Sequence, residues 1–423
     1  MELVKLKYLL AHSKNSMKVG PFGSQLAGTD FQSEGYKIYN QRTVLDNDFD
    51  VSDSFISAEK YAEMIGFKLN PLEILITTRG SIGKVAIAPQ NLDEGIIHPC
   101  IIKFAIDRSK VNNSFLVYIF NGTSITGEQL ALASNATTIA VVYSEPLRNI
   151  KIPLPSIREQ IEIVAYLDRR TAEIDSLLAD LQSQAEMLDR YKRELIAETV
   201  IKGLEKSAMM KDSDVEWIGE IPAHWELHPL VAVAKENNVK NIGMICDNLL
   251  SLSHGRIIQK DIDTNFGLLP KSFEGYQIVQ PGYTVLRLTD LQNDKRSLRT
   301  GYVGEMGIIT SAYMGLVPAS QLDGKYFNYL LHAYDLLKIY YGLGSGLRQT
   351  LKFSDMKRLP IPVPPMQEQE KISAFIDAKT EKINGLIADI NSQIEKLKQY
   401  RQIVIHDAVT GKIKVSEGMG DGN

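Results

Sequence analysis

The chain has 423 residues, of which 44% are apolar and 23% charged, and its formal net charge is −4. This composition is typical of a globular protein with two to four domains, and no run of about 18 apolar residues predicts a membrane span. The acidic balance excludes a chain that holds nucleic acid by bulk charge alone, although it permits local basic faces.

Cysteine usage and the first residues bear on the cellular compartment. Cys100 and Cys246 are too few for a disulfide framework or a zinc site, and we expect both to be buried small apolar residues. The opening Met1-Glu2-Leu3 segment is too polar for a secretory signal. We therefore expect a cytoplasmic protein.

Residues 1–150 predict a first globular domain of mixed α and β structure. Residues 73–78 and 84–88 predict two short strands around a glycine-containing turn, and the apolar run at 115–120 predicts a helix. The turn at 80–84, Gly-Ser-Ile-Gly-Lys, resembles a phosphate-binding loop. Its spacing and the residue after the lysine differ from that motif, so we expect a structural turn.

Residues 151–205 predict a long helix that is preceded by prolines and begins at a capping box of Ser156 and Glu159. A seven-residue apolar repeat then predicts a coiled coil, and a matching repeat occurs in residues 360–415. The predicted interface positions are Leu167, Ile174, Leu181, Leu188 and Leu195 in the first helix, and Ile376, Ile383, Ile390, Leu397 and Val404 in the second. Companion apolar positions, Leu177 and Leu386 among them, are expected to widen each stripe. The alternative is two amphipathic helices that each pack on their own domain.

A linker at 206–213 leads to a second predicted domain at 214–359. Residues 284–288 predict a strand, and the run at 326–341 predicts helix. The glycine-rich segment at 342–346 resembles a dinucleotide-binding loop. It follows a helical pattern instead of a strand, so we expect no cofactor there.

The chain contains an internal repeat with an offset of 209 residues. About 20 of the 49 positions are identical between residues 152–200 and 361–409, where about 3 would be expected by chance. Outside the helices the repeat is weaker. Residues 38–42 lie opposite 250–254, Ile82-Gly83 lies opposite Val303-Gly304, and the second domain carries extra residues between Asp290 and Thr300.

The sequence contains no recognisable catalytic motif. The Asn/Asp-Pro-Pro-Tyr/Phe run that an adenine methyltransferase needs is missing, and the seven histidines belong to no recognisable metal-binding motif. We therefore predict no catalytic residues, no metal site and no enzymatic activity in this chain, and we expect a binding protein or a scaffold.

Several motifs, in this order along the chain, resemble the specificity subunits of type I restriction–modification systems. They are Gly20 to Leu26; Ile152-Pro-Leu-Pro followed by Arg158-Glu-Gln; Trp217 to Trp225; Ile361-Pro-Val-Pro-Pro followed by Gln367-Glu-Gln; and Ala408 to Ile413. Together they cover essentially the whole chain. One departure is at the N-terminus, which lacks the Trp-Ile-Gly-Glu lead found before the second domain.

The resemblance implies an α+β fold. Two duplicated target-recognition domains would be joined by two long helices that form an antiparallel coiled coil with pseudo-two-fold symmetry, and residues 416–423 would be a flexible tail. Each domain would read one half of a split target in double-stranded DNA, and the helices would set the spacer. The partners implied are two methylation subunits and restriction subunits. Those partners would bring S-adenosylmethionine, ATP and Mg²⁺, and this chain would hold no cofactor.

DNA readers use polar side chains at loop tips to reach base edges and phosphates. In the first domain we expect such contacts from Lys18, Ser24, Gln25, Asn40, Gln41, Arg42, Thr78, Arg79, Ser81, Lys84 and Thr138. In the second we expect them from Ser253, His254, Arg256, Arg287, Asn293, Lys295, Arg296, Arg299, Ser345, Arg348 and Gln349. The alternative for each is a polar residue that serves the fold or faces solvent.

Two other functions remain open from the residues alone. One is a bridging scaffold in which a coiled coil joins two protein-binding domains. The other is a DNA-modifying enzyme that acts without partners, against which the missing methyltransferase and nuclease motifs argue.

Overall fold

The computed structural model describes residues 1–13, 15–22, 25–133, 141–262, 272–291, 298–343 and 350–415. Contacts divide the chain into two units, Met1–Leu181 with Ser392–Asn423, and Gln182–Asn391. The division falls inside both long helices instead of in the predicted linker at 206–213. The reason is that the core of each unit includes residues of both helices. The predicted tail at 416–423 lies outside the described residues.

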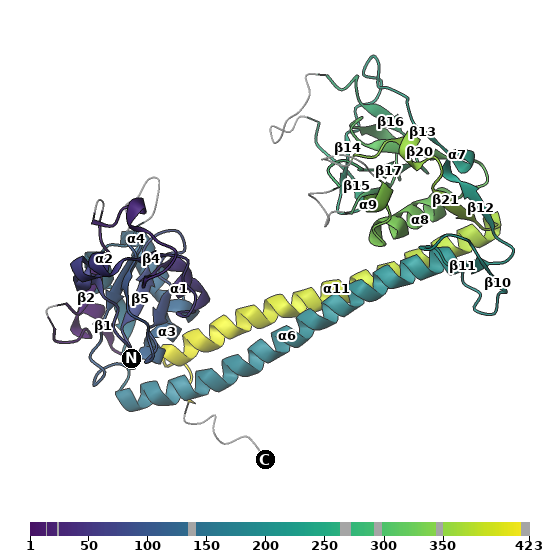
Figure 1. The fold of residues 1–423 in the computed structure, drawn as a ribbon. Coiled ribbons are helices and arrows are strands. Elements are labelled where there is room, and N and C mark those ends of the chain that lie inside the picture. The colour runs from purple at the N-terminus through teal and green to yellow at the C-terminus, as the bar shows by residue number, and fades with distance from the viewer. Residues whose placement is uncertain are drawn as a thin grey trace. The chain divides into compact units, whose positions relative to one another are not determined.

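The described part of the first unit contains a two-stranded sheet of β1 and β9 and two larger sheets (Figure 1). One has the order β2–β8–β5–β6 with antiparallel pairing, and the other has the order β4–β3–β7 with β3 and β7 parallel. The strands are β1 Leu3–Lys5, β2 Met17–Val19, β3 Tyr36–Tyr39, β4 Phe55–Ile56, β5 Ile74–Thr77, β6 Val85–Ile87, β7 Gly95–Ile97, β8 Ile101–Phe104 and β9 Lys151–Pro153. The helices before the long one are α1 Gln41–Asp46, α2 Ala58–Glu63, α3 Asn113–Gly122, α4 Ile125–Ala133 and α5 Ser144–Asn149, with short 3₁₀ turns at Leu6–Tyr8, Gly28–Asp30 and Ile65–Phe67.

The second unit repeats this plan. Its larger sheet has the order β13–β20–β17–β18, and β12 pairs with β21 as β1 pairs with β9. The strands are β10 Met210–Asp212, β11 Glu220–Pro222, β12 Glu226–Pro229, β13 Ala234–Glu236, β14 Leu250–Ser253, β15 Arg256–Gln259, β16 Gln277–Val279, β17 Thr284–Leu286, β18 Thr300–Tyr302, β19 Gly307–Ile309, β20 Met314–Pro318 and β21 Pro360–Val363. The shorter helices are α7 Leu230–Val233, α8 Gly324–Leu336, α9 Tyr340–Leu343 and α10 Phe353–Met356.

Strand pairing corrects the alignment of the two domains. Leu75 of β5 lies opposite Ala86 of β6, and Val285 of β17 lies opposite Gly301 of β18. The residue before β6, Lys84, therefore corresponds to Arg299, and the match of Ile82-Gly83 with Val303-Gly304 was wrong. The expected extra residues are confirmed, because residues 78–84 join β5 to β6 whereas residues 287–299 join β17 to β18.

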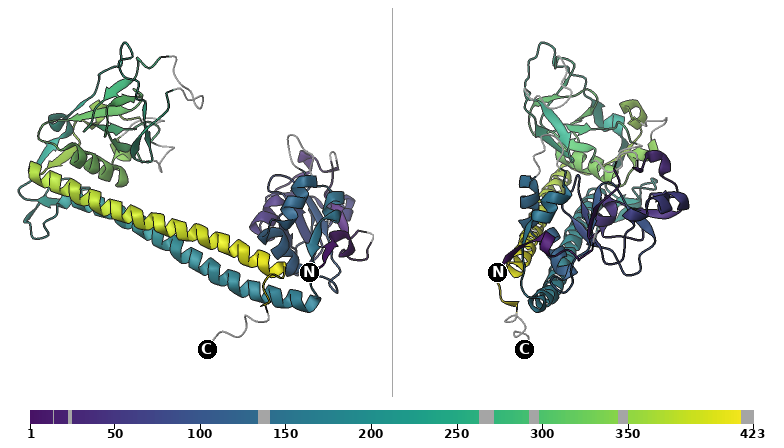
Figure 2. Two further views of the ribbon diagram at one scale, coloured as in Figure 1. Left: turned by 180° about the vertical axis from the view of Figure 1, so that it is seen from behind. Right: turned by 90° about the vertical axis from the view of Figure 1, so that its left-hand side faces the viewer.

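The two long helices are α6, Ile157–Lys202, and α11, Met366–Val409. In the first unit Ile163 and Leu167, near the start of α6, share a core with Val404 to Val409, near the end of α11. In the second unit Ile196 to Ile201 share a core with Ile372 and Ile376. The end of each helix thus packs with the start of the other, as an antiparallel pair requires, and Figure 2 shows the teal and yellow helices running side by side.

All ten predicted heptad positions are buried or half-buried. Their assignment to the coiled-coil interface stays a prediction. The prediction for Leu177 and Leu386 was wrong, because these side chains are 51% and 45% exposed. The capping box is confirmed: the Ser156 amide donates to a Glu159 carboxylate oxygen at 2.8 Å, and the Glu159 amide donates to the Ser156 hydroxyl at 3.3 Å.

Cys100 and Cys246 are free and half-buried, so they are more exposed than expected. Within the described residues, no helix is long and apolar enough to cross a membrane. The described histidines, cysteines and carboxylates form no group of three that could hold a metal ion.

Candidate nucleic-acid interface

The loop between β5 and β6 carries the exposed polar residues Arg79 and Ser81. Gly80 and Gly83 have φ values of 64° and 80°, which favour glycine, so the loop turns sharply at both positions. The Thr77 hydroxyl donates to the Ser81 carbonyl and closes the turn from inside. As predicted, this segment is a structural turn, and it presents two side chains that could contact DNA.

Basic groups accompany this loop. Burial lowers the pKa of His98, and the positive charge of Arg79 adds to that effect, so the two side chains are close enough to interact. Lys84 is exposed and donates to the Asn121 carbonyl at 3.3 Å. Lys84 also lines a cleft of about 810 Å³ together with His406 of α11.

The three predicted residues at the start of α1 are engaged within the protein. Asn40 caps α1: its side-chain oxygen accepts from the Arg42 amide at 2.8 Å, and its amide group donates to Asp53 at 3.0 Å. The Arg42 guanidinium forms an exposed ion pair with Asp46 at 3.1 Å. Gln41 lies against Gly80 of the β5–β6 loop. This part of the surface is rich in carboxylates, which repel phosphate.

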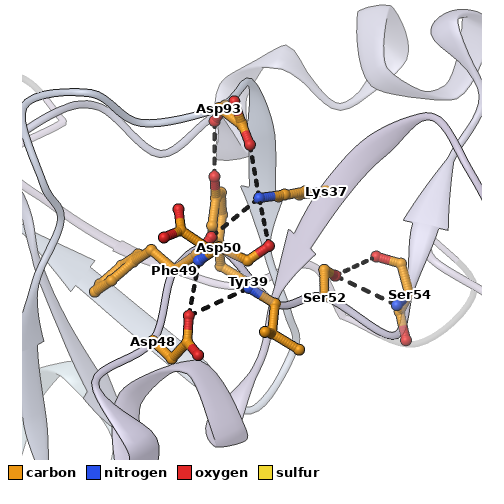
Figure 3. A network of polar contacts seen from close by, with 9 residues as sticks. Lys37, Tyr39, Asp48, Phe49, Asp50, Ser52, Ser54 and Asp93 are labelled. Carbon is orange, nitrogen blue, oxygen red and sulfur yellow. Dashed lines mark hydrogen bonds and ion pairs between the residues drawn. The ribbon is translucent and has the colours of Figure 1, made fainter.

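A polar network holds the segment that follows α1 (Figure 3). Lys37 of β3 donates to the carbonyls of Phe49 and Asp50, at 3.1 and 2.9 Å, and forms an ion pair with Asp93 at 2.6 Å. The Tyr39 hydroxyl donates to the Asp93 carbonyl at 2.7 Å. Because the network fixes the chain on both sides of α1, it holds this helix in a defined position.

The remaining first-domain predictions have mixed outcomes. The Lys18 ammonium lies over the Phe67 ring, 4.7 Å from its centroid. Gln25 is exposed, and its side-chain oxygen accepts from the Phe22 amide at 3.0 Å. Ser24 and Thr138 lie outside the described residues.

Thr78 is buried, with 3% of its surface exposed, and its hydroxyl donates to the Cys100 carbonyl at 2.9 Å. It joins the end of β5 to the segment before β8 and does not reach the surface. Its predicted DNA contact is therefore replaced by a role in the fold.

Arg299 is fully buried and also serves the fold. Its guanidinium donates to the Arg287 and Thr289 carbonyls at 3.0 and 2.9 Å and to the Tyr341 hydroxyl at 3.1 Å. It braces the long β17–β18 connection, as a planar group with five donors can. The prediction that Arg299 contacts DNA was wrong, because the side chain is buried. The sequence did not reveal this burial, since it depends on residues far away along the chain.

Strands β14 and β15 form a hairpin that carries three of the second domain's predicted residues. Ser253 pairs with Arg256 across a two-residue turn of His254 and Gly255, whose φ values are 49° and 75°. Two positive φ values define a type I′ turn, which matches the natural twist of a hairpin. Arg256 and His254 are exposed, and the Ser253 hydroxyl is hydrogen-bonded to the His254 ring at 3.1 Å.

A cleft of about 680 Å³ lies beside this hairpin, between the second domain and α6. It is lined by Lys192 and Arg193 of α6, by Arg287 and by His332 of α8. Burial, and then the charges of Lys192 and Arg193, lower the pKa of His332 to about 4, so this ring is neutral at pH 7. Asp189 forms ion pairs with both Lys192 and Arg193. The other predicted residues, Asn293, Lys295, Arg296, Ser345, Arg348 and Gln349, lie outside the described residues.

A matched pair of glutamines docks the domains on the helices. Gln160 of α6 accepts from the Asn112 amide at 2.8 Å and donates to the Lys110 and Pro155 carbonyls. Gln369 of α11 accepts from the Asp323 amide at the same distance and donates to the carbonyls of Gln321 and Pro364. The identity of these glutamines in the repeat therefore has a structural cause.

A matched pair of tyrosines, which the sequence analysis did not single out, completes the docking. The Tyr118 hydroxyl donates to Asp168 at 2.6 Å, and Tyr329 donates in the same way to Asp377. Burial, and then the hydrogen bond to Asp168, raise the pKa of Tyr118 to about 12. The signal was present in the sequence, because both the tyrosines and the aspartates recur between the repeats.

Comparison with known proteins agrees with this arrangement. The family model described as the type I restriction modification DNA specificity domain matches residues 25–187 and 298–396, more than half of the chain. A putative type I restriction enzyme MjaX specificity subunit from Methanocaldococcus jannaschii is 24% identical over 395 residues, covering 90% of this chain and 88% of that protein. The EcoBI specificity subunit of Escherichia coli is 21% identical over 346 residues, covering 72% of this chain and 68% of that protein.

Solved structures show the same fold. A chain from a type I restriction–modification system has a TM-score of 0.71 at 15% identity, with 97% of this chain and 98% of that chain covered. The HsdS subunit of Thermoanaerobacter tengcongensis has a TM-score of 0.51, also at 15% identity, with 97% of each chain covered. With two matching domains docked on a repeated helix and a family model that matches more than half of the chain, the chain belongs to the type I restriction modification DNA specificity family.

Proposed function

We propose that this chain gives a type I restriction–modification complex its DNA sequence specificity, with each domain reading one half of a split target. The observation that supports the proposal is that the two domains share their sheets and their attachment to the helices but differ in the connections between strands. The larger sheets of the two domains have the same strand order and are docked by identical helical residues. The connections between equivalent strands differ in length: residues 78–84 join β5 to β6, whereas residues 287–299 join β17 to β18. Two readers with different targets on one common support would have this form.

We further propose that the paired helices set the spacer between the two halves and dock the methylation subunits. Some residues that are identical between the repeats face solvent and do not hold the domains. The exposed identical pairs include Leu177 and Leu386, Gln184 and Gln393, and Tyr191 and Tyr400. Their spacing of seven residues places them along one stripe of each helix. An exposed leucine and tyrosine in both copies suit a partner protein that binds twice.

The chemistry in this proposal belongs to the partners. Methylation subunits would bring S-adenosylmethionine and transfer a methyl group to adenine, and restriction subunits would bring ATP and Mg²⁺. This chain would hold none of these and would act in the cytoplasm, where host DNA is found. Phosphate contacts shared with the partners would also account for a DNA reader with a net charge of −4.

Mapping adenine methylation at base resolution in the host, with and without this gene, tests the proposal. We expect a motif of two short defined halves around an undefined spacer to lose its methylation when the gene is deleted, and to regain it when the gene is restored. If the restored gene produces no methylated split motif while its partner subunits are expressed, the chain does not read DNA for methylation. A bridging scaffold then becomes the better explanation.

A further inference from the structure

The two domains differ most clearly in the element that follows the strand β3 or its equivalent β14. Both strands run parallel to a neighbour, β3 beside β7 and β14 beside β19. After β3 the chain forms the short helix α1, which packs on β5 and β6. After β14 it forms a tight hairpin whose second strand, β15, packs on β18, the equivalent of β6. The same position on the sheet is thus occupied by a helix in one domain and by a two-stranded ribbon in the other.

The hairpin has one face on the domain, and its other face is partly exposed and borders clefts that are also lined by α6 and α8. Leu252 and Ile257 lie on the inner face, where Gly301 of β18 leaves room for them; a Cβ at that glycine would come within 2.6 Å of Leu252. On the outer face Ser253 lies opposite Arg256, and Ser251 lies opposite Ile258. Arg256 is exposed and Ile258 is 42% exposed. Among the described residues, the Arg256 guanidinium has no hydrogen-bond or ion-pair partner, although the residue is paired with Ser253 in the hairpin.

The charge on these two elements has opposite sign. The hairpin, Leu250 to Gln259, contains Arg256 and no carboxylate, and Lys260 and Asp261 follow it directly. Residues 41–53, which form α1 and its following loop, contain one arginine against the four carboxylates of Asp46, Asp48, Asp50 and Asp53. A phosphate backbone is therefore attracted to the hairpin and repelled by the loop that follows α1.

We infer that the second domain reads its half-site with the outer face of the β14–β15 hairpin, placed in the major groove of duplex DNA, and that the first domain does not use the equivalent element. The major groove accepts a two-stranded β-ribbon. Arg256 is suited to the acceptors of a guanine edge, and Ile258 to the methyl group of thymine. The basic cleft beside the hairpin tip, with Lys192 and Arg193, supplies positive charge near the neighbouring phosphates. This inference rests on the proposed function and assigns one half of the target to a specific surface.

The test uses the complete methyltransferase complex expressed in a host with its partner subunits. Adenine methylation is mapped for the wild type, and exchange of residues 214–359 for the second domain of a subunit with another target identifies the half-site that this domain reads. The Arg256→Ala and Ile258→Ser variants are then mapped in the same way. Arg358→Ala is the matched control, because it removes an exposed arginine of the same domain outside the hairpin.

We expect Arg256→Ala to relax the preference at one base pair of the second half-site by about tenfold or more, with the first half-site unchanged. Ile258→Ser should relax a different position, and Arg358→Ala should leave the whole motif unchanged. Thermal melting of each variant checks that the second domain remains folded. If Arg256→Ala and Ile258→Ser both retain the wild-type motif, or lower methylation equally for all sequences, the inference is overturned while the proposed function stands. If the wild-type complex methylates no split motif, the proposed function fails and the inference with it.

Discussion

Tyr118 of α3 and Asp168 of α6 join the first domain to the helix that follows it by a hydrogen bond of 2.6 Å between the phenol and the carboxylate. Tyr329 and Asp377 repeat this bond in the second unit. The duplicated sequence thus preserves the attachment of the domains more faithfully than the surfaces they present.

Replacing Tyr118 by phenylalanine removes this bond without changing the packing of the ring. We expect the free energy of unfolding to fall by about 1 kcal/mol, because the bond is charge-assisted but Asp168 is exposed. Denaturant titration would measure the change. Tyr143→Phe is the control, since Tyr143 is 63% exposed. An equal loss in both variants would show that the bond to Asp168 does not hold the domain.

Arg299→Ala should unfold or severely weaken the second domain, by more than about 3 kcal/mol. The substitution leaves the part-buried carbonyl groups of Arg287 and Thr289 without this donor and creates a cavity where the fully buried side chain stood. Arg299→Lys should recover only part of the loss, because one ammonium group cannot bond to all of these acceptors. Circular dichroism and hydrogen exchange would report the unfolding. A folded Arg299→Ala variant with an altered methylation motif would restore this arginine to the DNA-reading surface.

His332 makes the stability of the second unit depend on pH. Its pKa is about 4 in the folded protein and has its ordinary value of about 6.5 in the unfolded chain, so protons bind the unfolded state more readily. The stabilisation is therefore complete above about pH 6.5 and is lost as the pH falls towards 4, by up to about 3 kcal/mol. Melting temperatures between pH 7 and 4 would measure it.

His332→Asn is the informative variant for this effect, because Asn121 occupies the corresponding place in α3 of the first domain. We expect a flatter dependence of the melting temperature on pH, with little change at pH 7. A steep dependence that persists in the variant would assign the acid sensitivity to other groups.

Leu177→Glu and Leu386→Glu should weaken binding of the methylation subunits without unfolding the helices. Both side chains are about half exposed, so a charge there costs little within this chain, whereas it would be costly inside a protein interface. Co-purification and light scattering would count the bound subunits. Glu173→Gln is a control on another exposed position of α6. Full binding by the double variant would exclude this stripe from the docking surface.

Arg79→Ala should weaken recognition of the half-site read by the first domain by about 1–3 kcal/mol, if the guanidinium contacts a guanine edge. Arg79 is exposed at the tip of the β5–β6 loop, next to a surface where Arg42 is paired with Asp46. Binding competition between duplexes with single base-pair changes would locate the effect. Equal weakening for every duplex would indicate a phosphate contact instead.

The long helices, the repeat and several short elements could be predicted from the sequence because their signals are local or periodic. The apolar heptads, the capping box at Ser156 and the strands at β5 and β6 are of this kind. The burial of Arg299 could not be predicted, because it depends on Arg287 and Tyr341, which lie 12 and 42 residues away. The hydrogen bond from Asn40 to Asp53 could not be predicted either, because the two residues are 13 positions apart in the sequence. A polar residue in a loop has the same sequence signature whether it faces DNA or braces the fold.

The glutamines at 160 and 369 have a consequence for how new specificities arise. Each binds a main-chain amide and a main-chain carbonyl of its domain, groups that almost every residue provides. The contact between helix and domain therefore depends little on which side chains the domain carries. A gene of this design can exchange an entire reading module by recombination within the well-matched helical segments and still produce a protein that assembles.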